Sequence, residues 1–190
     1  MLELAILGLL HESPRHGYEL RQRLKATLGA FRAFSYGSLY PTLRRMREAG
    51  WLAELAGDAD TVAEAPALTG RRGKVVYTLT ADGKDRLQEL LAEAGPSAWE
   101  DETFGVHFAL FSQTAPDVRV RILEGRRLRL EERREGVRLG LARTRERLDN
   151  YTLQLQEHGL ESVEREVRWL TELIETERSQ HRRNDQPPPA

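Results

Sequence analysis

The run from residue 116 to residue 158 constrains the fold most, because it contains no helix breaker stronger than three glycines. Twelve of its positions are spaced alternately three and four residues apart, and eight of the twelve are apolar. This spacing is typical of a coiled-coil seam and predicts one helix roughly 60 Å long. A helix of that length needs a partner to be stable. The seam consists of Val120, Leu123, Arg127, Leu130, Arg134, Val137, Leu141, Thr144, Leu148, Tyr151, Leu155 and His158.

Two further helices are expected beside this run. Gly159 closes the long helix, and the apolar residues after it predict a final helix that can fold back antiparallel. They are Val163, Val167, Leu170 and Ile174. Before the run, Ser97 and Glu100 have the spacing of a capping box and predict a helix that is apolar around much of its circumference. Its apolar residues are Phe104, Val106, Phe108, Leu110 and Phe111.

The apolar helix would leave a large exposed patch on a monomer. We therefore expect residues 96–178 to form a helical, coiled-coil-like dimerisation domain and the protein to be a homodimer. Residues 179–190 are polar and proline-rich, which predicts a disordered tail.

Residues 1–95 have the element order of a winged helix–turn–helix module. Helices are predicted over residues 2–10, 18–28 and 38–49, with Ser38 as the N-cap of the third and Gly50 after its end. "WLAEL" and "KVVYTLT" are typical of strands, joined by the loop 56–73, and Thr80 caps a fourth helix. A helix–turn–helix followed by a two-stranded hairpin is the winged form of this motif. The predicted fold class is mainly α with a two-stranded β wing.

The formal net charge of −1 hides a basic segment. Residues 15–47 contain eight Lys and Arg residues and a single acid, Glu19. Solvated helix faces usually mix both signs, so this surplus indicates a polyanion such as double-stranded DNA. A second hypothesis is that the same surface of a winged-helix module binds another protein.

The third predicted helix turns Leu39, Leu43 and Met46 toward the core. Small polar and aromatic side chains at its start can contact base edges, and arginine pairs with phosphate or guanine. Alternatively, Tyr36 or Tyr40 packs against the second helix, and Tyr18 belongs either to the core or to a phosphate contact. The expected DNA-binding residues are Tyr18, Arg21, Lys25, Ser35, Tyr36, Ser38, Tyr40, Thr42, Arg44 and Arg45.

No pattern in the chain predicts an enzyme, a cofactor site or a metal site. Without cysteine there is no thiolate ligand or nucleophile, and the five histidines lack ligand spacing. No G-x-S-x-G elbow is present. "MLELAILGLL" is too short to span a bilayer and does not resemble a signal peptide, so we expect a soluble, cytoplasmic protein.

The blocks "LAILGLL", "HGYEL", "SYGSLYPTLRRMREAGWL" and "GRRGKVVYTLTADG" resemble the PadR family of transcriptional regulators over most of residues 2–91. The resemblance implies a homodimeric repressor with its third helix in the major groove of a palindromic operator and its wing near the backbone or minor groove. Arg71, Arg72 and Lys74 match the family's basic strand-entry motif and join the expected DNA contacts. The wing loop is longer than is usual in the family and carries Asp58, Asp60 and Glu64.

Some members of this family release DNA when a small aromatic compound binds near the junction of the two domains. The residues that would line such an effector pocket here are Trp99, Phe104, His107, Phe108, Phe111 and Trp169. Aromatic walls with one titratable nitrogen suit a flat organic molecule that carries a hydroxyl or carboxylate. The alternative is an aromatic dimer core without a ligand.

Overall fold

The computed structural model describes residues 1–28, 36–56 and 75–184, and the chain divides into two compact units. Unit 1 consists of Met1–Glu93 and Asp101–Ala115, and unit 2 consists of Ala94–Glu100 and Pro116–Ala190. The boundary expected after residue 95 lies close to the first junction. Residues 101–115, however, pack with unit 1, although the sequence analysis placed them in the second domain.

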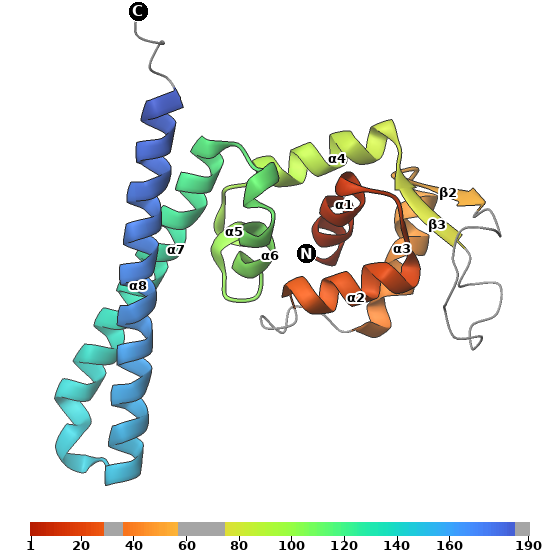
Figure 1. Cartoon of the computed structure of the whole chain (residues 1–190). Helices are drawn as coiled ribbons and strands as arrows, with labels where there is room; N and C mark the ends of the chain where they lie inside the picture. The colour runs from red at the N-terminus through yellow and green to blue at the C-terminus, as the bar shows by residue number, and fades with distance from the viewer. Residues whose placement is uncertain (29–35, 57–74, 185–190) are drawn as a thin grey trace, which may run out of the picture. The chain divides into compact units, whose positions relative to one another are not determined.

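Unit 1 combines helices with a small antiparallel sheet (Figure 1). Its elements are α1 (Leu2–Glu12), β1 (Arg15–His16), α2 (Gly17–Leu28), the 3-10 turn η2 (Tyr36–Ser38), α3 (Leu39–Glu48), β2 (Leu52–Ala56), β3 (Val75–Leu79), α4 (Ala81–Ala92), α6 (Phe104–Ala109) and the 3-10 turn η4 (Phe111–Gln113).

Helix α1 is the centre of unit 1. All residues from Leu4 to Leu10 are buried, so this helix is apolar on every side and needs neighbours around it. Figure 1 shows α2, α3 and α4 arranged about it, and all three contact it. The apolar stripes predicted for these helices are confirmed as core: Leu20, Leu24 and Leu28 of α2, Leu39, Leu43 and Met46 of α3, and Leu87 and Leu91 of α4.

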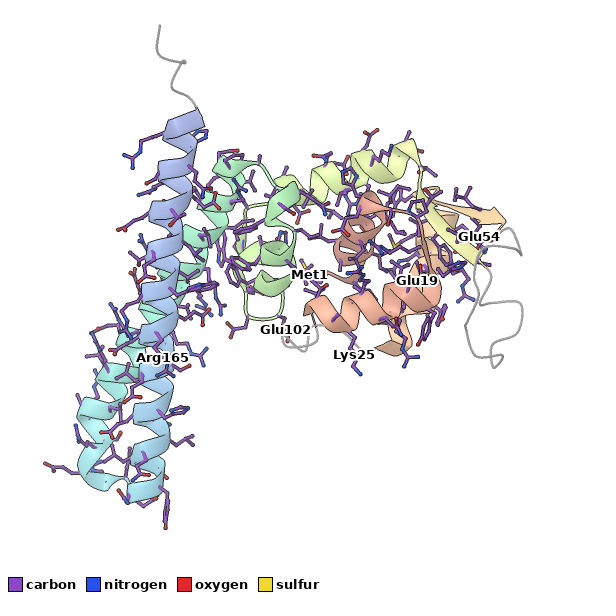
Figure 2. The ribbon with its side chains drawn as sticks, in the orientation of Figure 1. Met1, Glu19, Lys25, Glu54, Glu102 and Arg165 are labelled. Carbon is purple, nitrogen blue, oxygen red and sulfur yellow. The ribbon has the colours of Figure 1, made fainter. Side chains whose placement is uncertain are left out.

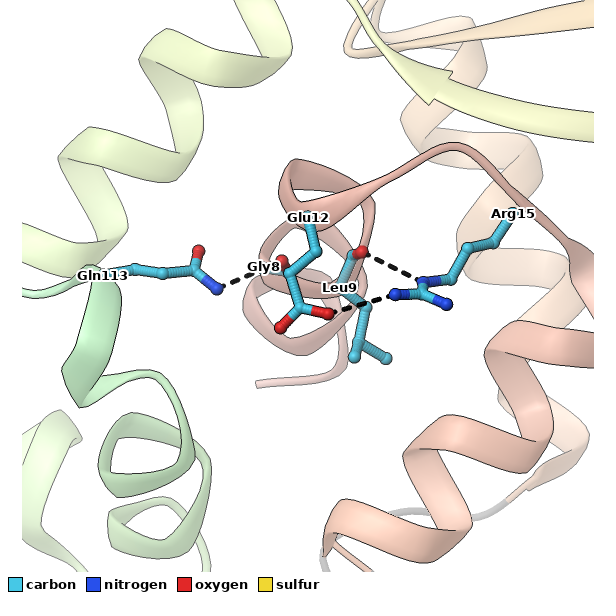
Figure 3. A network of polar contacts seen from close by, with 5 residues as sticks. All are labelled: Gly8, Leu9, Glu12, Arg15 and Gln113. Carbon is cyan, nitrogen blue, oxygen red and sulfur yellow. Dashed lines mark hydrogen bonds and ion pairs between the residues drawn. The ribbon is translucent and has the colours of Figure 1, made fainter.

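Polar contacts tie α1 to two segments that follow it in the chain (Figure 3). The Arg15 guanidinium donates from Nε to the Leu9 carbonyl at 3.3 Å and pairs with the Glu12 carboxylate at 3.0 Å. Gln113 Nε2 donates to the Gly8 carbonyl at 3.3 Å. A Cβ at Gly8 would overlap the Leu110 side chain, so glycine lets residues 101–115 approach α1 closely.

The sheet has three strands in the order β1-β3-β2, where the sequence predicted two. Strands β2 and β3 form the expected antiparallel hairpin, with Glu54 opposite Tyr77. On the other edge of β3, Arg15 lies opposite Tyr77. The added strand β1 is only two residues long, and so short a segment shows no alternation that a sequence pattern could detect.

Two predicted helix ends are confirmed. Gly50 has a φ of 79°, the left-handed conformation that suits glycine after the last turn of α3. Thr80 caps α4, because its hydroxyl accepts from the Gly83 amide at 3.0 Å. The same hydroxyl donates to the Gly50 carbonyl at 2.7 Å. One side chain therefore connects the end of α3 to the start of α4.

Unit 2 contains the short helix α5 (Pro96–Trp99) and a long antiparallel pair, α7 (Pro116–Thr144) and α8 (Asn150–Asn184), joined through the 3-10 turn η5 (Arg145–Arg147). The expected fold-back is confirmed, with Val163, Val167, Leu170 and Ile174 of α8 buried. Ion pairs between the two helices include Arg126–Glu166 at 2.9 Å and Arg138–Glu164 at 2.5 Å. No described helix is both long and apolar enough to cross a membrane.

The expected single helix to His158 is wrong, because the chain turns at residues 145–149. Asp149 provides the physical reason: its carboxylate accepts from the amides of Tyr151 and Thr152, both at 3.0 Å, and starts a new helix. The Thr152 hydroxyl, which donates to the same carboxylate at 2.6 Å, lowers the pKa of Asp149, and the amide hydrogen bonds lower it further. Gly159 lies inside α8 and does not end a helix. The last four seam positions therefore fall on the turn or on the second helix.

The helix expected to run from Ser97 through Phe111 is also interrupted, because α5 ends at Trp99 and α6 begins at Phe104. Within unit 2, α7 holds the end of α5. Arg126 donates to the Trp99 carbonyl at 3.2 Å, and the Trp99 ring lies against Gly125. These contacts favour a break after Trp99 over continuation of the helix.

The fit of Trp99 on Gly125 predicts opposite effects for two glycine substitutions in α7. A Cβ at Gly125 would overlap the body of the Trp99 ring, whereas a Cβ at Gly136 would meet nothing within 4 Å. We expect Gly125→Ala to lower the free energy of unfolding by about 1–3 kcal/mol. Gly136→Ala, the matched control, should raise it by about 0.5–1 kcal/mol through helix propensity. Urea unfolding followed by circular dichroism measures both, and equal effects would contradict the packing described here.

Candidate nucleic-acid interface

Helix α3 separates an apolar side from a basic side. Leu39, Leu43 and Met46 are buried, while Tyr40, Arg44 and Arg45 are exposed. Arg44 and Arg45 have no ion-pair partner among the residues that the structure describes. The two guanidinium groups are therefore available to phosphate or to guanine.

Helix α2 adds a second exposed basic surface in unit 1. Arg21, Arg23 and Lys25 are exposed, and Figure 2 shows Lys25 projecting away from the helices of the unit. Arg23 is two residues away from both Arg21 and Lys25, which places it on another side of the helix, so it does not extend the surface of Arg21 and Lys25. Tyr18 is 59 % exposed, and its hydroxyl accepts from Gln22 Nε2 at 2.6 Å. The core alternative for Tyr18 is therefore excluded.

Tyr40 packs partly against neighbours and remains 49 % exposed. A Cβ at Gly17 would lie 3.3 Å from the Tyr40 ring and 3.5 Å from the Tyr77 ring. Gly17 thus lets both rings approach the start of α2. Burial, followed by the Glu54 carboxylate, raises the pKa of Tyr77, so its hydroxyl stays neutral at physiological pH.

One predicted contact is corrected. Thr42 is only 5 % exposed, although the sequence analysis counted it among the DNA-binding residues. The reason is helical spacing, because Thr42 lies three residues after Leu39 and four before Met46, and both of those face the core. Thr42 therefore cannot contact a base without disrupting the helix packing.

Ser38 is exposed and occupies the N-cap position of α3, but its side chain makes no capping hydrogen bond. The backbone of Tyr36 belongs to η2. Ser35, Arg71, Arg72 and Lys74 lie outside the described residues, as do most of the predicted wing loop and its acids Asp58, Asp60 and Glu64.

Arg47 and Glu54 form a contact that sequence reasoning missed. Arg47, in the last turn of α3, donates to Glu54 of β2 with 2.6 Å between Nη1 and Oε1. The two residues are seven positions apart on different elements, so no helical spacing links them. Among the described residues of α3, Arg47 differs from Arg44 and Arg45 in having a carboxylate partner.

The predicted effector residues belong to both units. Phe104, His107, Phe108 and Phe111 are in unit 1, whereas Trp99 and Trp169 are in unit 2. Within unit 1 the three phenylalanines form a cluster, with ring centroids 5.7 Å apart for Phe104 and Phe108 and 5.0 Å apart for Phe108 and Phe111. Trp169 is 39 % exposed. The effector pocket stays a prediction.

No group of His, Asp and Glu suited to a metal ion occurs within residues 1–28, 36–56 and 75–184. His107 is buried, with 1 % of its surface exposed, and neither ring nitrogen has a hydrogen-bond partner in the described part of the chain.

Comparison with known proteins points to one family. Residues 6–89 match the family described as transcriptional regulator PadR-like. The negative transcriptional regulator PadR of Bacillus subtilis (strain 168) is 30 % identical over 96 residues, which make up 50 % of this chain and 48 % of that protein. The match thus spans about half the length of the relative.

Solved structures give a weaker likeness over more of the chain. PadR of Bacillus subtilis in complex with operator DNA is 21 % identical, with 93 % of this chain and 97 % of that chain covered and a TM-score of 0.42. The same protein in complex with p-coumaric acid is 20 % identical, with 93 % of this chain and 98 % of that chain covered and a TM-score of 0.42. A PadR-like transcriptional regulator from Bacillus cereus is 17 % identical, with 95 % of this chain and 99 % of that chain covered and a TM-score of 0.41.

The buried imidazole of His107 predicts a pH-dependent stability. Burial, and secondarily the N-terminal ammonium, lower its pKa from 6.5 to about 4. The folded state therefore favours the neutral ring, so this contribution is fully present above pH 6.5 and is lost as the pH falls toward 4. The loss should approach about 3 kcal/mol. His107→Leu should remove this part of the pH dependence in urea unfolding. Parallel curves of unfolding free energy against pH for the two proteins would contradict the assignment.

Proposed function

We propose that this chain, whose residues 6–89 match the PadR-like family of transcriptional regulators, is a sequence-specific DNA-binding transcriptional regulator that acts as a homodimeric repressor. The observation that carries the proposal is the basic outer surface of α2 and α3, with Arg44 and Arg45 exposed and without ion-pair partners in the described chain. An α-helix of this kind fits the major groove, where arginine can pair with O6 and N7 of guanine.

The surface supports division of labour between the two helices. Arg21 and Lys25 of α2 are suited to phosphate, which fixes the register and orientation of the protein on the duplex. Tyr40, Arg44 and Arg45 of α3 are suited to base edges, which carry the sequence information. Repression is proposed by analogy with the relative that is named a negative regulator.

Homodimerisation is supported by unit 2, whose hairpin leaves large apolar side chains on its surface. Tyr151 is 84 % exposed and Leu155 is 67 % exposed, one helical turn apart on α8. Leu128 and Leu139 of α7 are also exposed. A second copy would cover this surface and would present two α3 helices to half-sites about one helical turn of DNA apart, or a multiple of it.

We also propose that the protein responds to an aromatic effector. The cluster of Phe104, Phe108 and Phe111 is suited to stacking with a flat organic molecule. PadR of Bacillus subtilis has been solved with p-coumaric acid, a compound of that kind. An effector must bind the DNA-free state better than the DNA-bound state in order to release the operator.

Arginine substitutions in α3 test the DNA-binding proposal. The full chain is first used to select duplexes from a random-sequence pool, and affinities are then measured for a selected and a scrambled duplex. We expect Arg44→Ala or Arg45→Ala to weaken binding to the selected duplex by about 1–3 kcal/mol. Arg129→Ala, which removes an exposed arginine from unit 2, is the matched control and should change little. Wild-type affinity should also fall with salt, with a log–log slope of about −0.9 per phosphate contact.

Two results would contradict the DNA-binding proposal. One is a failure of the wild-type chain to enrich any sequence from the pool. The other is binding that is unaffected by salt between about 50 and 200 mM. Either result would favour the alternative, in which the same surface binds a protein partner.

A charge placed on the exposed stripe of α8 tests the homodimer. Leu155→Glu should shift the sedimentation coefficient at micromolar concentration from that of a dimer to that of a monomer, because a carboxylate would be buried without a partner. Gln156→Glu introduces the same charge at the next exposed position and serves as the control. A wild-type chain that sediments as a monomer would contradict the proposal.

A further inference from the structure

One flank of α3 touches the sheet at both of its ends. Tyr40, Arg44 and Arg47 are spaced four and three residues apart, which puts them on one side of the helix. At the first end the Tyr40 ring lies beside Gly17, next to Tyr77 of β3. At the other end Arg47 is bonded to Glu54 of β2. The exposed guanidinium of Arg44 lies between these two points of attachment.

The Arg47–Glu54 pair contributes little to stability. The Arg47 side chain is 46 % exposed and that of Glu54 is 35 % exposed, and pairs at such positions typically contribute less than about 1 kcal/mol. The pair also places a carboxylate on the wing, the part of the module that approaches a polyanion. A stability role alone therefore gives no reason for an acid at position 54.

The strand register sets the place of Glu54 on the sheet. Glu54 lies directly opposite Tyr77 in the antiparallel register, so the two side chains share one face of the sheet. Arg15, opposite Tyr77 on the other edge, is itself anchored to α1 through Leu9 and Glu12. Glu54 thus lies on the face of the sheet that also carries Tyr77 and Arg15, and Figure 2 labels it on β2.

We propose that Glu54 is a positioning residue for sequence discrimination: its carboxylate holds the Arg47 guanidinium in one orientation at the end of the recognition helix. The inference rests on the proposed DNA-binding function. The N–H groups of Arg47 that Glu54 does not occupy are offered at a fixed place to one base edge or one phosphate. Released from Glu54, the long side chain would rotate freely and pair with whichever phosphate lies nearest, on any sequence.

This role makes Glu54→Gln affect two DNA substrates in opposite directions. Using the full chain with the selected and the scrambled duplex, we expect affinity for the selected duplex to fall and affinity for the scrambled duplex to rise. The ratio of the two affinities should drop about five- to tenfold, the lower part of the range for losing one base contact. On scrambled DNA the salt slope should steepen by about 0.9, which corresponds to one added phosphate contact.

Two companion variants distinguish the positioning of Arg47 by Glu54 from a general repulsion of DNA by the negative charge of Glu54. Glu48→Gln removes an exposed acid from the same end of α3 without touching Arg47, and it should strengthen binding to both duplexes by the same factor. In an Arg47→Ala background, Glu54→Gln should no longer change the affinity ratio, because the group that it positions is gone. Circular dichroism melting of each variant establishes that the fold is retained.

The outcomes separate this inference from the function on which it rests. If the wild-type chain enriches no sequence, the DNA-binding proposal itself fails. If it enriches a sequence but Glu54→Gln and Glu48→Gln act alike, Glu54 only repels DNA and the inference is overturned. It is likewise overturned if Glu54→Gln changes the ratio equally with and without Arg47.

Discussion

The burial of α1 on all sides from Leu4 to Leu10 is the constraint on which unit 1 depends. A helix whose residues from Leu4 to Leu10 are all buried cannot stand at a surface, so α2, α3 and α4 must each turn an apolar stripe toward it. That arrangement leaves the opposite sides of α2 and α3 in solvent, and those sides carry the arginines. The basic face is thus a consequence of how the core is filled, and the contacts of Gly8 and Arg15 fix α1 within it.

Unit 2 follows a different principle, since its two long helices support each other. Buried Val163, Val167, Leu170 and Ile174 form one side of the contact, and cross-helix ion pairs such as Arg126–Glu166 surround it. A two-helix hairpin has only one buried face, so apolar side chains such as Tyr151 and Leu155 remain in solvent. Within this account, that uncovered surface is the physical reason to expect a second copy of the chain.

The sequence predicted most of the helices of unit 1 because α2, α3 and α4 have clear apolar stripes, Thr80 caps α4 and a glycine follows the end of α3. Prediction from the sequence failed where one residue pattern was compatible with two different structures. Thr42 shares a helical side with Leu39 and Met46, a spacing that outweighs its polarity. Leu148 and Tyr151 continued a 3–4 spacing across a turn, and the capping position of Asp149 was the signal that would have revealed it. The Arg47–Glu54 contact joins separate elements and has no local signature.

The central claim is that the outer side of α3 lies against DNA bases, and photochemical crosslinking tests it most directly. A selected duplex carrying 5-iodouracil in place of single thymines is irradiated in complex with the full chain, and crosslinked peptides are identified by mass spectrometry. Iodouracil couples preferentially to aromatic side chains at the interface, and Tyr18 and Tyr40 are the exposed tyrosines of α2 and α3. We expect crosslinks at Tyr40, with Tyr18 next. Crosslinks confined to Tyr151 or Trp169 of α8 would contradict it.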